Sequence, residues 1–150
     1  MEMRIHEAQL DDELLENLIA MSAEWEAENS CYGYRKNVCG DIAGNRIFLA
    51  EQDGKILGYL FGHTERSERP SSVMAEGTPY FEIEELYVVP EHRSEGIGGA
   101  LFRFVEREVQ GTEIEYIMLS TATKNYKSIL HFYIDELGME FWSARLFKRI

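Results

Sequence analysis

Val88–Leu101 reads VVPEHRSEGIGGAL: an apolar run, a proline turn, the pattern Arg-x-x-Gly-x-Gly and then helix-forming residues. Glycines at the start of a helix let the backbone approach a ligand closely, and the free N–H groups of the first helical turn attract anions. No Gly-Lys-Ser/Thr follows, as a Walker loop requires, and Leu101 stands where a dinucleotide fingerprint has its third glycine. The stretch therefore predicts a strand, a pyrophosphate-binding loop of another kind and a helix.

The segment Glu84–Leu101 resembles the acetyl-CoA signature of the GNAT N-acetyltransferases, in which Arg/Gln-x-x-Gly-x-Gly/Ala follows the fourth strand. A second segment, Asn125–Met139, is similar to a later helix of that family, with its asparagine, its tyrosine and its glycine exit. Two motifs in the right order are more specific than either motif alone. The resemblance covers essentially the whole chain, weakly before Arg46 and strongly after Phe81. It implies an enzyme that transfers an acetyl group from acetyl-CoA to an amine.

The same resemblance implies a fold class. Members of the family are α/β (α+β) proteins with a central, mixed and twisted sheet flanked by helices. Their central parallel strands splay apart to admit the pantetheine arm of the cofactor. A chain of 150 residues suits one domain, and neither repeats nor linkers interrupt it, so we expect a single domain over residues 1–150.

Hydrophobic periodicity and turn residues predict the order of the elements. From Tyr80 onward the order strand, helix, strand, helix predicts parallel neighbours joined by a right-handed crossover. The expected elements are a strand at Met3–Glu7, a helix carrying Leu14 to Trp25, a second helix at Tyr34–Ile42, a hairpin of Arg46–Glu51 and Lys55–Gly62 around Asp53-Gly54, a long loop at Thr64–Thr78, a strand at Tyr80–Val89, a helix at Gly98–Val109, a strand at Glu113–Ser120, a helix at Lys124–Leu137 and a last strand at Glu140–Lys148.

The composition favours a cationic partner. With 27 acids against 15 bases the net charge is −12, which repels nucleic acid and attracts cationic substrates. The alternative reading is that an acidic surface mainly confers solubility. No run approaches the about 18 apolar residues of a membrane helix, and no signal peptide begins the chain. We therefore expect a soluble, cytoplasmic protein with neither a nucleic-acid partner nor a membrane partner.

Cysteine and histidine positions indicate neither a metal site nor a covalent mechanism. Cys31 and Cys39 lack Cys-x-x-Cys spacing and are expected to be reduced. No Gly-x-Ser-x-Gly elbow or Cys/His nucleophile is present, so direct transfer in a ternary complex is expected. The four histidines are scattered and predict no metal: His6, His63, His92 and His131.

Three acids lie on the strand that leads into the phosphate loop. Amide formation needs a neutral amine, and an alkyl ammonium has a pKa of about 10, so a carboxylate that takes its proton assists the reaction. In a regular strand Glu82 and Glu84 share a face and Glu85 points the other way, although a bulge would reverse part of that assignment. The resemblance makes Glu84 the base or ammonium anchor, with Glu82 as its partner. A solvated strand face is the alternative, and the choice among the three acids stays open.

Tyr133 and Asn125 are further candidates from the resemblance. The family's tyrosine lies near the cofactor sulfur, so Tyr133 would protonate the departing thiolate; helical spacing would also suit a packing role. Asn125 matches a residue that hydrogen-bonds the pantetheine amides, and it would also serve as an ordinary helix cap.

The resemblance also assigns the cofactor contacts. Backbone groups of Tyr87 and Val88 would meet pantetheine, and Arg93 would add positive charge at the pyrophosphate. Glu95 departs from the usual small or basic residue and must point away from the phosphates or weaken binding. Arg103, Lys124 and Lys127 would compensate near the 3′-phosphate. The amides that would hold the pyrophosphate run from Arg93 to Gly99 and so include Ser94, Glu95, Gly96, Ile97, Gly98 and Gly99.

The sequence defines the acceptor less closely than it defines the cofactor. By the resemblance, a group of acidic and aromatic residues lies in the region that the family uses as one wall of the acceptor site. With Glu82 and Glu84 this group would form an acidic cleft for a polyamine, an aminoglycoside or a lysine side chain. A CoA-binding regulatory module without turnover and a protein-lysine acetyltransferase stay open, as does a homodimer through the last strand or the long loop. The additional cleft residues are Glu24, Glu26, Glu28, Tyr32 and Tyr34.

Overall fold

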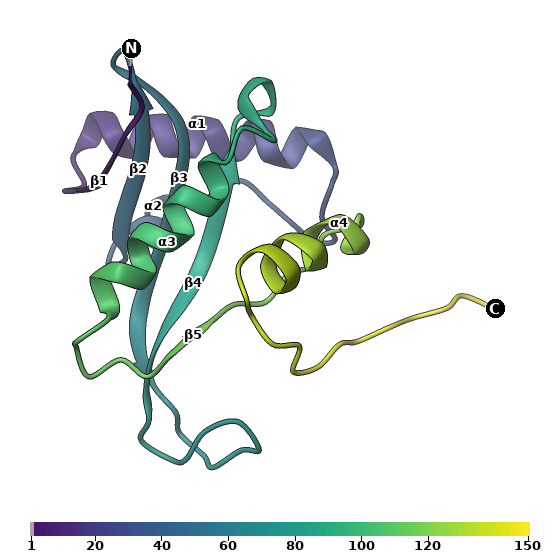
Figure 1. The fold of residues 1–150 in the computed structure, drawn as a ribbon. Helices are drawn as coiled ribbons and strands as arrows, with labels where there is room; N and C mark the ends of the chain where they lie inside the picture. Colours follow the sequence, from purple (N-terminus) through teal and green to yellow (C-terminus); the bar gives the residue numbers. More distant parts are fainter. Residues whose placement is uncertain (1) are drawn as a thin grey trace.

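The computed structural model describes residues 2–150 and contains a five-stranded mixed sheet with helices against both of its faces (Figure 1). The first four strands are antiparallel neighbours, and the fifth runs parallel to the fourth. This arrangement confirms the expected fold class. In sheet order the strands are β1 (Arg4–Ala8), β2 (Arg46–Gln52), β3 (Lys55–Arg66), β4 (Pro79–Val88) and β5 (Tyr116–Met118).

The helices differ in length and in how they begin. The side chain of Asp11 caps α1 by accepting the N–H of Leu14 at 2.8 Å. Asn29, with φ 53°, ends that helix in the left-handed region. Within residues 2–150 none of the helices is long and apolar enough to cross a membrane. The helical segments are α1 (Asp12–Glu28), α2 (Cys39–Ile42), the short turn η1 (Pro90–His92), α3 (Ile97–Val109), α4 (Tyr126–Leu130) and the π-helical segment η2 (His131–Glu136).

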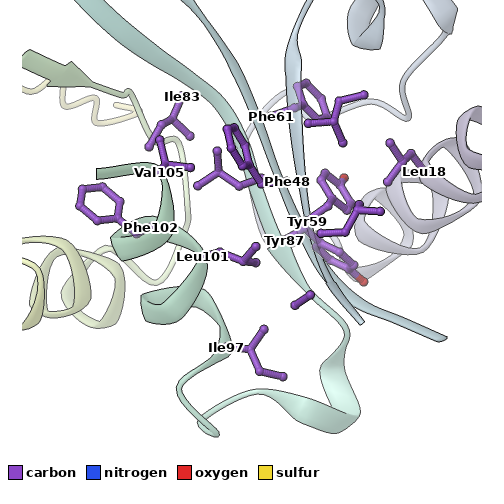
Figure 2. Close-up of a cluster of buried hydrophobic side chains, with 14 of the residues drawn as sticks. Leu18, Phe48, Tyr59, Phe61, Ile83, Tyr87, Ile97, Leu101, Phe102 and Val105 are labelled. Carbon is purple, nitrogen blue, oxygen red and sulfur yellow. The ribbon is translucent and has the colours of Figure 1, made fainter. Parts of the chain in front are cut away.

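The core is formed where α1 and α3 cover the two faces of the sheet. Leu18 of α1 lies on one side, and Leu101 and Val105 of α3 lie on the other, with the side chains of the strands between them (Figure 2). All three side chains are fully buried, and each contributes about 1.5–3 kcal/mol through burial. This packing fixes the start of α3 beside the end of β4, which is where the phosphate loop is predicted.

A bulge interrupts β4. Its pairing with β3 shifts between Phe61↔Glu85 and Gly62↔Ile83, so Glu84 is the extra residue. A side chain at Gly62 would collide with the backbone carbonyl of Glu82, so only glycine allows the two strands to approach here.

The bulge changes which side chains share a face of the sheet. Ile83 lies beside Phe102 and Val105 on the α3 face (Figure 2). Tyr87 lies on the α1 face, where its ring stacks on Trp25 at 5.1 Å. Regular alternation would have put Ile83 and Tyr87 on one face, so the pattern expected of an unbroken strand is wrong here.

β4 and β5 pair only where they begin. Their partners are Tyr80↔Tyr116, Phe81↔Ile117 and Glu82↔Met118, after which the strands separate. The remainder of β4 therefore faces an opening in the sheet, as the splayed strands of the expected fold require.

Several predicted elements have other bounds in the structure. The strand expected over Glu113–Ser120 is limited to β5, because the segment diverges from β4 beyond Met118. The helix expected at Tyr34–Ile42 forms only in its last turn, α2, because side-chain bonds hold the preceding residues in a loop. β3 continues to Arg66, into the stretch expected as the start of a long loop.

The last predicted strand, Glu140–Lys148, is wrong for a single chain. Residues 140–150, called the C-terminal tail below, have no regular secondary structure and project away from the sheet (yellow end in Figure 1). A strand requires a neighbour for its backbone N–H and C=O groups, and the tail leaves the body before it reaches one.

Candidate active site

A cavity of about 290 Å³ lies where β4 and β5 separate. A larger hollow of about 560 Å³ between β1 and α1 contains none of the motif residues, so the smaller cavity is the candidate site. Its walls come from the end of α1 and the following loop, from the β4 bulge, from the segment after β5 and from α4 and η2. The lining residues are Trp25, Cys31 to Tyr34, Ile83 to Leu86, Leu119 to Thr123, Ile129 and Tyr133.

Two of the three predicted catalytic residues, Glu84 and Tyr133, line this cavity together. Tyr133 belongs to η2 and is 9% exposed. Burial, and secondarily the nearby Cys31, raises the pKa of the Tyr133 phenol to about 12. The phenol therefore holds its proton at neutral pH and is able to donate it.

Glu82, the third predicted catalytic residue, does not line the cavity. It is half-buried, and burial followed by the charge of Glu84 raises its pKa, against an opposing effect of His63. The Oε1 atom of Glu84 lies 3.7 Å from Nδ1 of His63. Glu82 and Glu84 are thus neighbours, but only Glu84 borders the space that a substrate would enter.

Glu85 is the centre of a buried cluster at the cavity wall. Its Oε1 atom accepts hydrogen bonds from the Tyr34 hydroxyl at 3.0 Å, the Tyr59 hydroxyl at 2.9 Å and the Asn37 amide at 3.0 Å. Burial raises the pKa of Glu85, and the three bonds oppose that shift. Sequence spacing carries no signal for this cluster, since its donors come from a loop and from β3.

The loop after α1 is fixed against that helix. The buried Ser22 hydroxyl accepts the Asn37 N–H at 2.9 Å, and the Tyr34 ring stacks on Trp25 at 4.3 Å. These contacts hold the rings of Trp25 and Tyr34 in the wall of the cavity that Tyr133 also lines. The expected acidic wall is wrong in part, because Glu24, Glu26 and Glu28 do not line the cavity, whereas Tyr32 and Tyr34 do.

The predicted phosphate loop has the backbone geometry of an anion site. Ser94 and Gly96 both have positive φ, 64° and 85°, which turns the chain sharply before α3. The first hydrogen bond of that helix runs from the Ala100 N–H to the Gly96 carbonyl. The N–H groups of Ile97 to Gly99 therefore have no intrahelical acceptor and are available to an anion.

Gly98 has a packing role in addition. A Cβ atom there would lie 3.3 Å from the Phe132 ring, so the glycine lets η2 approach the first turn of α3. This contact brings the Tyr133 segment close to the phosphate loop.

Arg93 has protein partners that sequence reasoning missed. Its guanidinium forms two bonds to Glu28, at 2.7 and 2.9 Å, and its Nε donates to the Val88 carbonyl at 2.9 Å. The pairing holds the pKa of Glu28 below its usual value. The Tyr87 hydroxyl also donates to Glu28, at 3.2 Å. The positive charge of Arg93, which was expected to bind the pyrophosphate, is thus balanced by the carboxylate of Glu28 at the end of α1.

The other predicted cofactor contacts also have partners within the chain. Asn125 caps α4 by accepting the Ser128 N–H at 3.4 Å, and Glu95 lies 3.2 Å from Nδ1 of His92. Lys124 donates to Asn29 at 3.1 Å. Of the predicted contacts, the clearest match to a pyrophosphate is therefore the backbone of the loop and not these side chains.

The sequence profile of the Acetyltransferase (GNAT) family matches residues 8–139. The chain belongs to the GNAT acetyltransferase family. No curated protein matches the sequence significantly.

Solved structures share the GNAT fold at low sequence identity. An aminoglycoside acetyltransferase from an uncultured soil metagenomic sample is 17% identical with a TM-score of 0.72, covering 100% of this chain and 99% of its own. A second such enzyme, solved in complex with sisomicin, is 17% identical with a TM-score of 0.67, at 99% and 96% coverage. A predicted acetyltransferase from Clostridium acetobutylicum, solved with acetyl-CoA, is 16% identical with a TM-score of 0.68, at 99% and 96% coverage.

GNAT enzymes use acetyl-CoA, and the loop before α3 fits its pyrophosphate because backbone N–H groups are unpaired there and Gly96 adopts the required φ. Across residues 2–150, three or more His, Cys, Asp or Glu side chains do not gather in a way that would hold a metal ion.

Replacing Gly96 with valine is expected to weaken acetyl-CoA binding by about 10- to 100-fold. A β-branched residue at positive φ costs about 1–3 kcal/mol, so the loop relaxes and binding must restore the strained conformation. Isothermal calorimetry with acetyl-CoA measures the change. The matched control is Gly44→Val, because Gly44 has φ 86° and open space around it, as Gly96 does, but lies far from the loop in the chain. Equal binding by both variants would contradict the assignment of the loop.

Proposed function

We propose that the protein transfers the acetyl group of acetyl-CoA to a primary amine of a cationic acceptor, by direct attack in a ternary complex. The observation that carries the proposal is that Glu84 and Tyr133 line one cavity where β4 and β5 separate. A carboxylate and a protonated phenol are the base and the acid that this reaction requires.

When bound, acetyl-CoA supplies an activated acetyl thioester. Glu84 accepts a proton from the acceptor ammonium, directly or through water, so that the neutral amine can form the new C–N bond. Tyr133 gives its phenolic proton to the sulfur as the C–S bond breaks, and the extra proton on the nitrogen of the new amide returns through water to the tyrosine phenolate. Glu82 is proposed as the partner of Glu84 and not as the base, because it lies beside Glu84 but does not line the cavity.

Backbone groups hold the cofactor in this proposal. The amides of Ser94 to Gly99 bind the pyrophosphate, and the exposed edge of β4 at Tyr87 and Val88 pairs with the pantetheine amides, assisted by Asn125. For Arg93 to contact a phosphate, the phosphate must compete with the carboxylate of Glu28. Arg93 is therefore proposed as a residue that joins β4 to α1 and only secondarily as a phosphate ligand.

The acceptor is proposed to be a small molecule with more than one ammonium group, such as a polyamine or an aminoglycoside. The cavity wall supports this, because two carboxylates, Glu84 and Glu85, lie beside the aromatic rings of Trp25, Tyr32 and Tyr34. Carboxylates and aromatic faces both attract cations. The similarity to two aminoglycoside acetyltransferases agrees with that class of acceptor.

The test is release of free CoA thiol from acetyl-CoA in the presence of polyamines, aminoglycosides, amino acids and lysine peptides. We expect release that depends on a small polycationic amine and is weaker by tenfold or more with lysine peptides. Release with lysine peptides alone would replace the small-molecule acceptor with a protein one. Calorimetric binding of acetyl-CoA without release across the panel would favour a regulatory module, and the absence of binding would refute the cofactor site.

A further inference from the structure

Glu84 has an ion-pair partner on the neighbouring strand β3. Nδ1 of His63 lies 3.7 Å from Oε1 of Glu84. His63 is also the direct cross-strand partner of Glu82, and its charge lowers the pKa of that carboxyl against the larger effects of burial and of Glu84. His63 does not line the cavity, so any effect that it has on a substrate passes through the carboxylates of β4.

The imidazole of His63 is fixed by two further partners. Its Nδ1 atom lies 3.0 Å from Oδ1 of Asn45, and its Nε2 atom lies 2.9 Å from Oε1 of Glu65. The orientation of the Asn45 amide is set independently, because its Nδ2 atom donates to the carbonyls of Asp41 and Ile42, at 3.0 Å each. The amide oxygen is therefore the atom that faces the imidazole.

These partners select the charged form of the imidazole. An amide oxygen and a carboxylate oxygen only accept hydrogen bonds, so each ring nitrogen needs a proton in order to bond with its partner. A neutral imidazole has a single N–H and would turn one lone pair toward an oxygen. The doubly protonated imidazolium satisfies Asn45 and Glu65 together, and its positive charge also faces Glu82 and Glu84.

A positive charge is needed here because carboxylates gather on β3 and β4. Burial, then Glu84 and also Glu65, raise the pKa of Glu82, and His63 opposes them. Repulsion among neighbouring carboxylates favours the protonated form of one of them. A protonated carboxyl is unable to accept the proton of an ammonium group, so a catalytic base in this cluster requires a compensating cation.

We propose that His63 is a positioning residue for acetyl transfer, because as an imidazolium it holds Glu84 in the carboxylate form that accepts the acceptor's proton. The inference rests on the proposed function and assigns a role to a residue outside the cavity. The side chains of His63 and Glu84 are 31% and 45% exposed, so solvent weakens their attraction. We therefore expect an effect of about 0.5–1 pH unit, below the usual range for a close opposite charge.

The direction of the pH dependence follows from the charge of the imidazole. A histidine loses its positive charge between about pH 5 and 8. Below that range the imidazolium favours ionised Glu84, and above it protons are too scarce to neutralise a carboxylate. His63→Gln, which keeps a donor for Asn45 but carries no charge, should therefore impair the reaction at low pH and leave it unchanged near pH 9.

The first test needs no activity. The imidazole of His63 is titrated by NMR in the full chain, in the wild type and in Glu84→Gln. The midpoint for His63 should fall by about 0.5–1 pH unit in the variant, because coupling between two groups is reciprocal. His6 is the matched control, since it is 24% exposed and pairs with Glu51 at 3.2 Å, and its midpoint should not change. An unchanged midpoint for His63 would refute the ion pair whatever the protein catalyses.

The second test is the pH profile of kcat/KM for an amine acceptor, measured for the wild type, His63→Gln and His6→Gln. In His63→Gln the acid limb should move to higher pH by about 0.5–1 unit, a loss of about three- to tenfold below its midpoint, and His6→Gln should follow the wild type. An equal loss at every pH would show a merely structural role. An unmoved acid limb would refute the role of His63 and leave acetyl transfer in place, whereas a wild type without thiol release would refute the proposed function itself.

Discussion

Replacement of Tyr133 with phenylalanine is expected to lower kcat for acetyl transfer by about 100- to 1,000-fold, the usual contribution of a positioned general acid. The dissociation constant of acetyl-CoA should stay within about twofold, because the ring is kept and only the hydroxyl is removed. The ring of Tyr133 packs between Phe132 and Phe102, with centroids at 5.0 and 6.5 Å, so the variant retains its core contacts. Steady-state kinetics combined with calorimetry measures both quantities.

The kcat of Tyr133→Phe distinguishes the acid role from a packing role. Because the pKa of the Tyr133 phenol is raised to about 12, the wild-type enzyme should show no loss of activity from its deprotonation below about pH 10. The control is Tyr126→Phe, since Tyr126 lies on the adjoining helix and is 59% exposed. If Tyr133→Phe keeps the wild-type kcat, the tyrosine only packs, and the proton for the thiolate comes from solvent.

Replacement of Glu84 with glutamine is expected to lower kcat/KM for the amine by about 100-fold at pH 7, the lower end of what a general base contributes. The defect should shrink to less than about tenfold near pH 10, where the amine loses its proton without help. The side chain keeps its shape, so a purely structural role would give no such dependence on pH. Initial rates over pH 6 to 10 provide the measurement.

Glu82→Gln is the matched control for Glu84→Gln, since Glu82 is a neighbour on the same strand that does not line the cavity. Its loss of kcat/KM should not exceed about tenfold, because Glu82 does not border the space that the acceptor would enter. A larger loss at Glu82 than at Glu84 would exchange their roles. A rise in KM with unchanged kcat in Glu84→Gln would make Glu84 an ammonium anchor and not a base.

The sequence predicted the parts of this molecule that depend on local signals. The sharp turn before α3 follows from Gly96 and the residues around it, and the order strand, helix, strand, helix from Tyr80 to Leu137 follows from hydrophobic periodicity. The pairing of Glu84 with Tyr133 in one cavity came from the family resemblance, and no periodicity would have given it. Each of these inferences depends either on residues that are close together in the sequence or on motifs whose order in the family is fixed.

Contacts between distant segments were the ones that sequence reasoning missed. The bulge at Glu84 depends on Gly62 in another strand, and the Arg93 pair depends on Glu28 at the end of α1. The Glu85 cluster combines a loop with β3. The strand expected in the tail failed because residues 140–150 leave the body before they reach a neighbouring strand.

The Glu85 cluster has a consequence for how substrate preference changes in evolution. Because Tyr34 and Asn37 are both held by one oxygen of Glu85, the path of this loop does not depend on the two residues between them. Arg35 and Lys36 are exposed, and exposed positions tolerate substitution within about 0.5 kcal/mol. Related proteins are thus free to vary the charge at these two positions, which follow the cavity-lining Tyr34 in the sequence, while the path of the loop stays in place.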